Sequence, residues 1–327
     1  MKKAAFLIFV FLITFRPIAQ AQQSAVVIDA DLTESPVLIK TLSGQISGSL
    51  VIPKNNSGKI PVVLIIGDSG PTDRDGNNAK AGIKGNTYKL LANELGKSGI
   101  ATLRYDKRGV GESVSSTSEK LLQINDYGDD AVELINLLNN DQRFSKIILL
   151  GHGEGSLVSM LAITDQPIAA FISVEGLGDT AEKFLTDQMK DKPKFLADEF
   201  KTILDSLRKG KTTDMVDPSL YYIARPSNQH FLMSWCRYSP VKGIKSIKKP
   251  ILIIQGTTDL IIATENGQKL KKAKSDAIYL EIKGMNHILK DAPADEGKNM
   301  ETYAKADLPL KPEFVKAVAD FIIKLKN

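Results

Sequence analysis

The sequence predicts an α/β fold with a mostly parallel central sheet flanked by helices. Short apolar runs recur along the chain, helical patterns lie between most of them, and one long helical stretch interrupts the alternation. Residues 60–66 show the run in its clearest form, because unbroken β-branched and aliphatic residues are typical of a strand buried on both faces. Strands that alternate with helices favour parallel pairing, with helices on both faces of the sheet.

The elements follow from these patterns in order. Strands are expected at residues 36–41, 45–52, 60–66, 100–105, 146–150, 168–174, 251–255 and 277–282, with Ser43 and Gly44 turning the first pair. Helices are expected at residues 86–97, 125–140, 156–164, 264–273 and 312–326. Pro312 suits the first turn of the last helix, because proline lacks the N–H that this turn leaves unpaired.

The stretch from about 179 to 238 has helical patterns and no convincing strand. Its helices are expected at residues 180–189, 193–209 and 227–236. Because the chain afterwards returns to the sheet, the stretch is interpreted as a helical cap over the carboxyl edge of the strands. The predicted domain therefore covers residues 22–327, with the cap as an insertion.

The first 21 residues are predicted to be a signal peptide. Lys2 and Lys3 give a basic start, residues 4–15 are apolar, and residues 19–21 read Ala-Gln-Ala, a pattern typical of a cleavage site. A membrane anchor is the alternative, but the run is short for a bilayer and ends at Arg16 and Pro17. We expect export to the periplasm or secretion, with no membrane attachment after cleavage.

Composition excludes several classes of protein. The 327 residues fit one large domain. Loss of the leader removes three positive charges from a net charge of +5, and the remaining basic residues are mixed with acids, which disfavours nucleic-acid binding. The single cysteine, Cys236, excludes an internal disulfide and has the apolar surroundings of a buried thiol. No metal or cofactor motif is present, and the oligomeric state stays open.

Residues 151–155 read Gly-His-Gly-Glu-Gly, between a buried strand and a helix. Serine hydrolases carry G-x-S-x-G there, in a sharp turn that projects the serine over the edge of the sheet. Gly153 stands at the middle position and adopts the strained backbone of such a turn at little cost, but it has no hydroxyl. Ser156 and Ser159 are expected to lie within the following helix, out of reach. A dinucleotide-binding loop is disfavoured, because Ser156 stands where its third glycine belongs.

Asp259 and His287 follow the last two predicted strands, in the chain order in which hydrolases of this kind place their acid and histidine. Either residue alone is more often a turn residue or incidental. Together with the turn at Gly153, they predict a triad-type site. The loop after residue 66 would contribute one oxyanion-hole N–H, for which we nominate Ser69, and Glu154 would contribute the other. In that loop Asp73, Arg74 and Asp75 are expected to form a local ion-pair network, and residues 104–111 a scaffold turn.

Five stretches of the chain resemble the α/β-hydrolase superfamily. They are G-P-T-D-R-D-G-N at 70–77, R-Y-D-K-R-G-V-G-E-S at 104–113, G-H-x-E-G at 151–155, Q-G-T-T-D at 255–259 and G-M-N-H at 284–287. Within the superfamily they are most similar to bacterial carboxylesterases of the EstD-like kind and serine-aminopeptidase-like hydrolases. The resemblance implies an α/β-hydrolase fold, cleavage of small carboxylic esters, and Ser, Asp and His at positions 153, 259 and 287.

Two residues depart from this family pattern. Gly153 replaces the serine, and Asp68 stands where a small residue is usual, beside the expected oxyanion hole. A carboxylate there disfavours negative charge on a substrate oxygen, unless its side chain points away. Three hypotheses follow: an ester hydrolase that has lost its nucleophile by mutation, a natural pseudoenzyme that binds a small acyl or ester-like ligand or a protein partner, and a hydrolase that uses water activated by His287.

Overall fold

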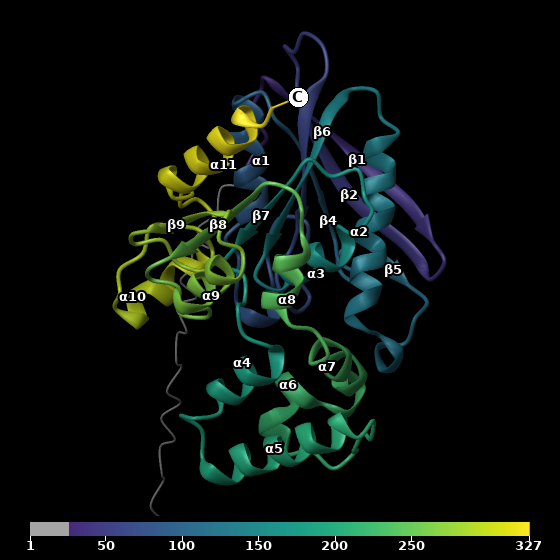
Figure 1. Ribbon diagram of the computed structural model, residues 1–327, viewed down its shortest axis with the longest axis vertical. Helices are drawn as coiled ribbons and strands as arrows, with labels where there is room; N and C mark the ends of the chain where they lie inside the picture. The colour runs from purple at the N-terminus through teal and green to yellow at the C-terminus, as the bar shows by residue number, and fades with distance from the viewer. Residues whose placement is uncertain (1–25, 327) are drawn as a thin grey trace, which may run out of the picture.

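The computed structural model describes residues 26–326, so the predicted leader lies outside the described residues. Nine strands of the described chain form one sheet in the order β1-β2-β4-β3-β6-β7-β8-β9, with β5 paired to β2 (Figure 1). The strands are β1 Leu32–Thr41, β2 Gly44–Pro53, β3 Ile60–Ile66, β4 Ala101–Tyr105, β5 Val114–Ser115, β6 Phe144–His152, β7 Ala170–Val174, β8 Ile251–Gly256 and β9 Ile278–Ile282.

The sheet is mostly parallel, in agreement with the prediction from the sequence. From β4 to β9 every neighbouring pair is parallel, whereas β2 runs antiparallel to β1, β4 and β5. The central strands β3, β4 and β7 are almost entirely buried, in agreement with their unbroken apolar sequences. The carboxyl ends of β3, β6, β8 and β9 therefore lie along one edge of the sheet.

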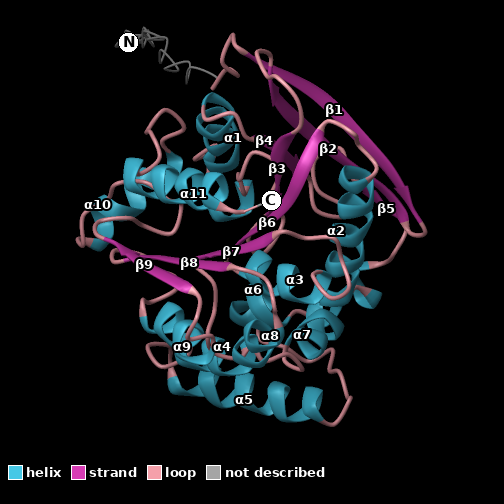
Figure 2. Cartoon of the chain, turned by 45° about the horizontal axis from the view of Figure 1, so that its top comes forward, coloured by secondary structure: helices cyan, strands magenta, loops and turns pink. Residues whose placement is uncertain are grey.

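Helices cover both faces of the sheet (Figure 2). On one face α1 Thr87–Lys97 packs with the closing helix α11 Pro312–Lys324 over a core that includes Ile65, Leu91 and Phe314. The other face carries α2 Ile124–Asn139, α3 Glu154–Ala162, α8 Pro240–Ser246 and α9 Glu265–Ala273. The short α10 Glu296–Glu301 lies in the connection between β9 and α11.

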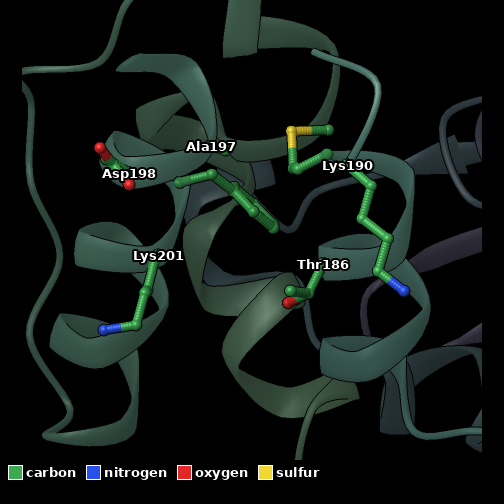
Figure 3. A pocket seen from close by; sticks show the side chains of 7 residues that line it. Thr186, Lys190, Ala197, Asp198 and Lys201 are labelled. Atoms are coloured by element: carbon green, nitrogen blue, oxygen red, sulfur yellow. The ribbon is translucent and has the colours of Figure 1, made fainter. Parts of the chain in front are cut away.

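Between β7 and β8 the chain forms only helices. They are α4 Ala181–Gln188, α5 Lys194–Arg208, α6 Tyr221–Ala224, α7 Gln229–Trp235 and then α8. Helices α4 to α7 extend beyond the carboxyl edge of the sheet (Figure 1). A hollow of about 220 Å³ lies between α4 and α5 (Figure 3), lined by Thr186, Met189, Lys190, Ala197, Asp198, Phe200 and Lys201. Within residues 26–326 no helix is long and apolar enough to cross a membrane.

Some short elements escaped the sequence patterns. Strand β5 has two residues, and α8 and α10 have seven and six, which is too short for a periodic pattern to develop. Short 3-10 turns occur at Ala79–Ala81, Glu119–Leu121, Pro218–Leu220, Pro226–Asn228 and Thr302–Ala304. Helix α3 begins at Glu154 rather than at residue 156, so the turn at Gly153 leads into it without a linker.

Gly155 is expected to tolerate no side chain. A Cβ at this position would lie 2.2 Å from the carbonyl oxygen of Ile66 and 2.6 Å from that of Gly67, both of them backbone atoms. Gly155→Ala should therefore lower the free energy of unfolding by roughly 1–3 kcal/mol, measured by urea denaturation. Gly128→Ala in α2 is the matched control, because its Cβ would meet only Leu161 at 3.5 Å. Equal destabilisation by the two variants would contradict this explanation of the packing.

Candidate active site

Gly153 forms a sharp turn between β6 and α3. Its backbone angles are φ 53° and ψ −117°, a left-handed conformation that residues with a side chain adopt only under strain. The turn is tight on both sides, because a Cβ on Gly151 would lie 2.3 Å from the carbonyl oxygen of Gly155. The turn expected from the sequence is thus present, and residue 153 lies at its tip beside the ends of β3, β8 and β9.

The structure brings Asp259 and His287 together from the loops after β8 and β9. The Nδ1–H of His287 donates to Asp259 Oδ2 at 2.8 Å, and both side chains are buried. Two backbone N–H groups, of Ile261 and Ile262, donate to the other carboxylate oxygen at 2.7 and 2.9 Å. These bonds fix the carboxylate and, through it, the orientation of the imidazole.

The Asp68 carboxylate fills the space above Gly153. Its Oδ2 accepts from His287 Nε2 at 2.9 Å, and its Oδ1 accepts from the backbone N–H of Glu154 at 3.1 Å. The N–H of the next residue, Ser69, also contributes to the lowered pKa of this carboxylate. A Cβ built on Gly153 would lie only 1.9 Å from Asp68 Oδ1. The N–H of Glu154, one of the two nominated from the sequence for an oxyanion hole, therefore already binds a negative charge from the chain itself.

His287 is an imidazolium, because the carboxylates of Asp259 and Asp68 lie on either side of it. Burial by itself would lower the pKa of His287, but the charges and hydrogen bonds of Asp259 and Asp68 outweigh it and hold the pKa well above its usual value. Burial would likewise raise the pKa of Asp68, but the charge and hydrogen bond of His287 hold that pKa far below its usual range. At neutral pH the site is thus carboxylate, imidazolium, carboxylate.

His152 and Tyr88 connect the backbone at Asp68 to the backbone at His287 by hydrogen bonds. Asp68 N–H donates to the Tyr88 hydroxyl at 2.9 Å, and that hydroxyl lies 2.8 Å from His152 Nδ1. His152 Nε2 lies 2.8 Å from the backbone carbonyl of His287. Burial, together with the charge of His287, lowers the pKa of His152 to about 4. The ring is therefore neutral, with Nε2–H as donor and Nδ1 as acceptor, and it links the backbones of residues 68 and 287.

Glu175 is a protonated acid behind Asp259. Burial, followed by the charge of Asp259, raises the pKa of Glu175 well above its usual value, and its carboxyl is hydrogen-bonded to Asp259. Gly256 N–H and the Gln255 side chain donate to its oxygens. Two carboxyl groups in direct contact require a proton between them, so Glu175 is the donor. No sequence pattern predicted this role for Glu175.

Lys107 and Glu154 form a buried ion pair beside Asp68. Lys107 Nζ lies 2.7 Å from Glu154 Oε1 and donates to the backbone carbonyl of Asp68 at 3.0 Å. The pair thus connects the start of α3, the end of β3 and the loop after β4. Sequence reasoning missed this role, because Lys107 falls in a charged stretch that was interpreted as a scaffold turn.

The ion pairs of the loop after β3 are not local, which corrects the expectation for residues 73–75. Arg74 pairs with Asp106 at 2.6 Å and with Glu112 at 2.7 Å, both in the loop after β4. Asp75 pairs with Arg104 of β4 at 2.9 Å. Because an arginine has five donors in a fixed fork, one side chain can tie two loops together. These contacts fix the loop that carries Asp68.

The remaining hydroxyls near the turn are engaged inside the fold. Ser156 Oγ lies 2.7 Å from Ser173 Oγ, and Ser159 Oγ donates to the carbonyl of Gly155 at 2.7 Å. Both serines are buried in α3, as expected, and neither reaches the tip of the turn. Within residues 26–326 no group of His, Cys, Asp and Glu side chains is arranged to hold a metal ion.

The chain is similar to known hydrolases in sequence and fold. A family model described as serine aminopeptidase, S33, matches residues 82–215. Esterase EstD of Thermotoga maritima is 25% identical over 254 residues, which cover 76% of this chain and 59% of the relative. Est1E of Butyrivibrio proteoclasticus, solved with ferulic acid, superposes with a TM-score of 0.59 at 18% identity over 88% of this chain and 98% of its own.

The fold recurs in more distant structures. Pyrococcus furiosus esterase Pf2001 superposes with a TM-score of 0.56 at 16% identity, over 90% of this chain and 93% of its own. The α/β hydrolase GrgF of a Penicillium species gives 0.58 at 15% identity, over 90% and 99%. The chain thus spans about three fifths of its curated relative and nearly the full length of the solved structures. These structural likenesses establish the fold.

The imidazolium is predicted to stabilise the fold, because without it two carboxylates face each other. His287→Ala should lower the free energy of unfolding by about 3–5 kcal/mol at pH 6, the cost of breaking a buried pair from one side. Asp68→Asn should cost less, since Asp259 remains to pair with His287. Urea denaturation measures both variants against the unchanged chain.

The difference in unfolding free energy between the unchanged chain and Asp68→Asn should depend on pH in a definite direction. The raised pKa of His287 gives stability that is complete below the unfolded value near 6.5 and is lost as pH rises through the folded value. The lowered pKa of Asp68 gives stability that is complete above about pH 4 and is lost as pH falls. The gap between the unchanged chain and Asp68→Asn should therefore be widest between about pH 4 and 6.5. A gap that grows toward pH 9 would contradict the ion pair.

Proposed function

We propose that the chain, an esterase-like protein with the α/β-hydrolase fold, binds small ester-like or acyl-bearing molecules beneath α4 to α7 without serine-dependent ester cleavage. We propose further that it is exported, on the basis of the predicted leader. The observation that carries the proposal is the contact between two departures from the family pattern: Asp68 lies in the space that a side chain on residue 153 would need.

A lone Ser→Gly change would leave a space above the turn. Here that space is filled, and the filling carboxylate is bonded to His287 and to the N–H of Glu154. Serine-type acyl transfer needs a hydroxyl on the histidine and free N–H donors for the developing oxyanion. Both requirements fail together in this chain. The coupled exchange favours natural loss of the serine chemistry over an isolated lesion at Gly153.

His287 is also unsuited to activate water directly. Its Nε2 keeps its proton and donates a hydrogen bond to Asp68, so Nε2 has no lone pair to accept a proton from water. This disfavours the hypothesis in which His287 acts as a base on water while Asp68 remains ionised. Loss of the nucleophile alone costs serine hydrolases about 10⁶-fold in turnover, so the expected ester cleavage is close to background.

Access supports ligand binding at the same place. The Asp68 side chain is 17% exposed, whereas those of His287 and Asp259 are 3% and 0% exposed, so Asp68 is the member of the three that solvent reaches. The following residues, Ser69, Gly70 and Pro71, are exposed and form a rim. The relatives named as esterases, and the structure of Est1E with ferulic acid, favour a small ester or carboxylic acid as the ligand class.

Three variants test the coupling. Gly153→Ser alone should stay inactive on short-chain p-nitrophenyl esters, because Asp68 blocks the hydroxyl and the N–H donors. Gly153→Ser with Asp68→Gly should gain esterase activity and react with a fluorophosphonate probe at the introduced serine. Gly153→Ser with Asp68→Asn is the matched control, since it removes the charge but keeps the bulk, and it should remain inactive.

Binding is read from the same panel. Millimolar p-nitrophenyl butyrate should raise the thermal unfolding temperature of the unchanged chain, because a ligand that binds only the folded state stabilises it. Activity in the single Gly153→Ser variant would contradict the coupled exchange. Strong esterase activity of the unchanged chain, or no ligand-induced stabilisation in any variant, would overturn the proposed function.

A further inference from the structure

We propose that Asp68 is itself a nucleophile and that the chain hydrolyses small alkyl electrophiles, molecules with a saturated carbon that bears an anionic leaving group such as bromide, through an alkyl ester on Asp68. This activity goes beyond the binding of ester-like ligands. It rests on how the Asp68 carboxylate is held, and it holds or fails independently of that binding.

The two oxygens of Asp68 have different surroundings. Oδ1 is held by the N–H of Glu154 at 3.1 Å, whereas Oδ2 faces Nε2 of His287 at 2.9 Å. Lys107 and Tyr88 fix the backbone of the same residue, through its carbonyl at 3.0 Å and its N–H at 2.9 Å. The side chain is nevertheless 17% exposed. An ionised, oriented and accessible carboxylate meets the requirements for covalent catalysis.

Chemistry selects saturated carbon as the target. A carboxylate that attacks an ester carbonyl would form an anhydride, which is more reactive than the ester it came from. Attack on a saturated carbon gives an ordinary ester instead. In such a displacement the leaving group departs on the side opposite to Oδ2, and therefore away from His287, so it must leave as a stable anion without a proton.

The first step balances as a displacement. An electron pair of Asp68 Oδ2 forms the new carbon–oxygen bond, and the bond from carbon to bromine breaks, so that bromide leaves with its pair. The carboxylate becomes a neutral ester. His287 then keeps only Asp259 as a charged partner at 2.8 Å, which lowers the pKa of the imidazolium, and its Nε2 proton passes to solvent.

The second step returns the enzyme to its starting state. Neutral His287 accepts a proton from water at Nε2, and the resulting hydroxide adds to the carboxyl carbon of Asp68. The oxyanion forms on Oδ1, where the N–H of Glu154 already donates. Collapse breaks the bond from that carbon to Oδ2, and the departing alkoxide takes the proton from His287. The Asp68 carboxylic acid then passes its proton to Nε2 of neutral His287, which restores the carboxylate and the imidazolium. The sum is alkyl bromide plus water giving alcohol, bromide and a proton.

Gly153 belongs to the same arrangement. With any side chain at residue 153 the Asp68 carboxylate could not keep its position, because even a Cβ would lie 1.9 Å from Oδ1. The hydrogen bonds from the protonated Glu175 and from the backbone of Ile261 and Ile262 keep Asp259 oriented toward His287. His287, oriented by Asp259, serves the second step as the base that removes a proton from water.

Bromide release from 1-bromobutane tests the activity. The unchanged chain should release bromide and form 1-butanol continuously, and Asp68→Asn should fall to the uncatalysed background. Asp165→Asn is the matched control, because Asp165 is an exposed loop aspartate in a left-handed conformation that asparagine also adopts. It should retain full activity. Release that persists in Asp68→Asn would overturn the proposal.

Two mass measurements locate the covalent step. His287→Gln lacks the base for the second step, so after reaction with 1-bromobutane its Asp68 peptide should carry one butyl group. In the unchanged chain, which needs no mutation, turnover in ¹⁸O-water should place ¹⁸O in the Asp68 carboxylate, since water attacks the enzyme carbon. No adduct and no label on Asp68 would overturn the proposal, whether or not ester-like ligands bind.

Discussion

The imidazolium of His287 between Asp259 and Asp68 is the interaction on which the site depends. It joins the loops after β3, β8 and β9, with bonds of 2.8 and 2.9 Å. The single positive charge permits the buried Asp259 and the partly buried Asp68 to remain ionised close together, which would otherwise be costly. Around it, the His152, Glu175 and Lys107 contacts fix the loops that supply each member. As in a serine triad, a histidine lies between an acid and a third side chain, but here the third side chain is the carboxylate of Asp68.

The position of Asp68 changes what the glycine in the turn means. Asp68 occupies the place that a hydroxyl on residue 153 would need, and it binds one nominated oxyanion donor, the N–H of Glu154. Gly153 and Asp68 follow different strands, yet a side chain on residue 153 and the Asp68 carboxylate could not occupy their positions together. The proposed loss of serine chemistry and the proposed carboxylate chemistry thus rest on the same geometric exchange.

Sequence patterns predicted the fold, because strand ends and their order carry strong local signals. The structure brings Asp259 and His287, which the sequence had nominated, into contact. Sequence patterns also marked Asp68 as unusual. They could not show that its side chain points inward, since that direction depends on three-dimensional partners such as Glu154 N–H. Glu175 and Lys107 went unrecognised for the same reason: a buried acid or lysine has no sequence signature until the groups that surround it are known.

The protonation state of His287 tests the account most directly. Nitrogen NMR of the imidazole at pH 7 reports whether both ring nitrogens carry protons. We predict an imidazolium in the unchanged chain that persists well above pH 7, and a lower pKa of His287 in Asp68→Asn, where one of the two carboxylates is gone. A neutral ring at pH 7 whose titration is the same in both proteins would contradict it.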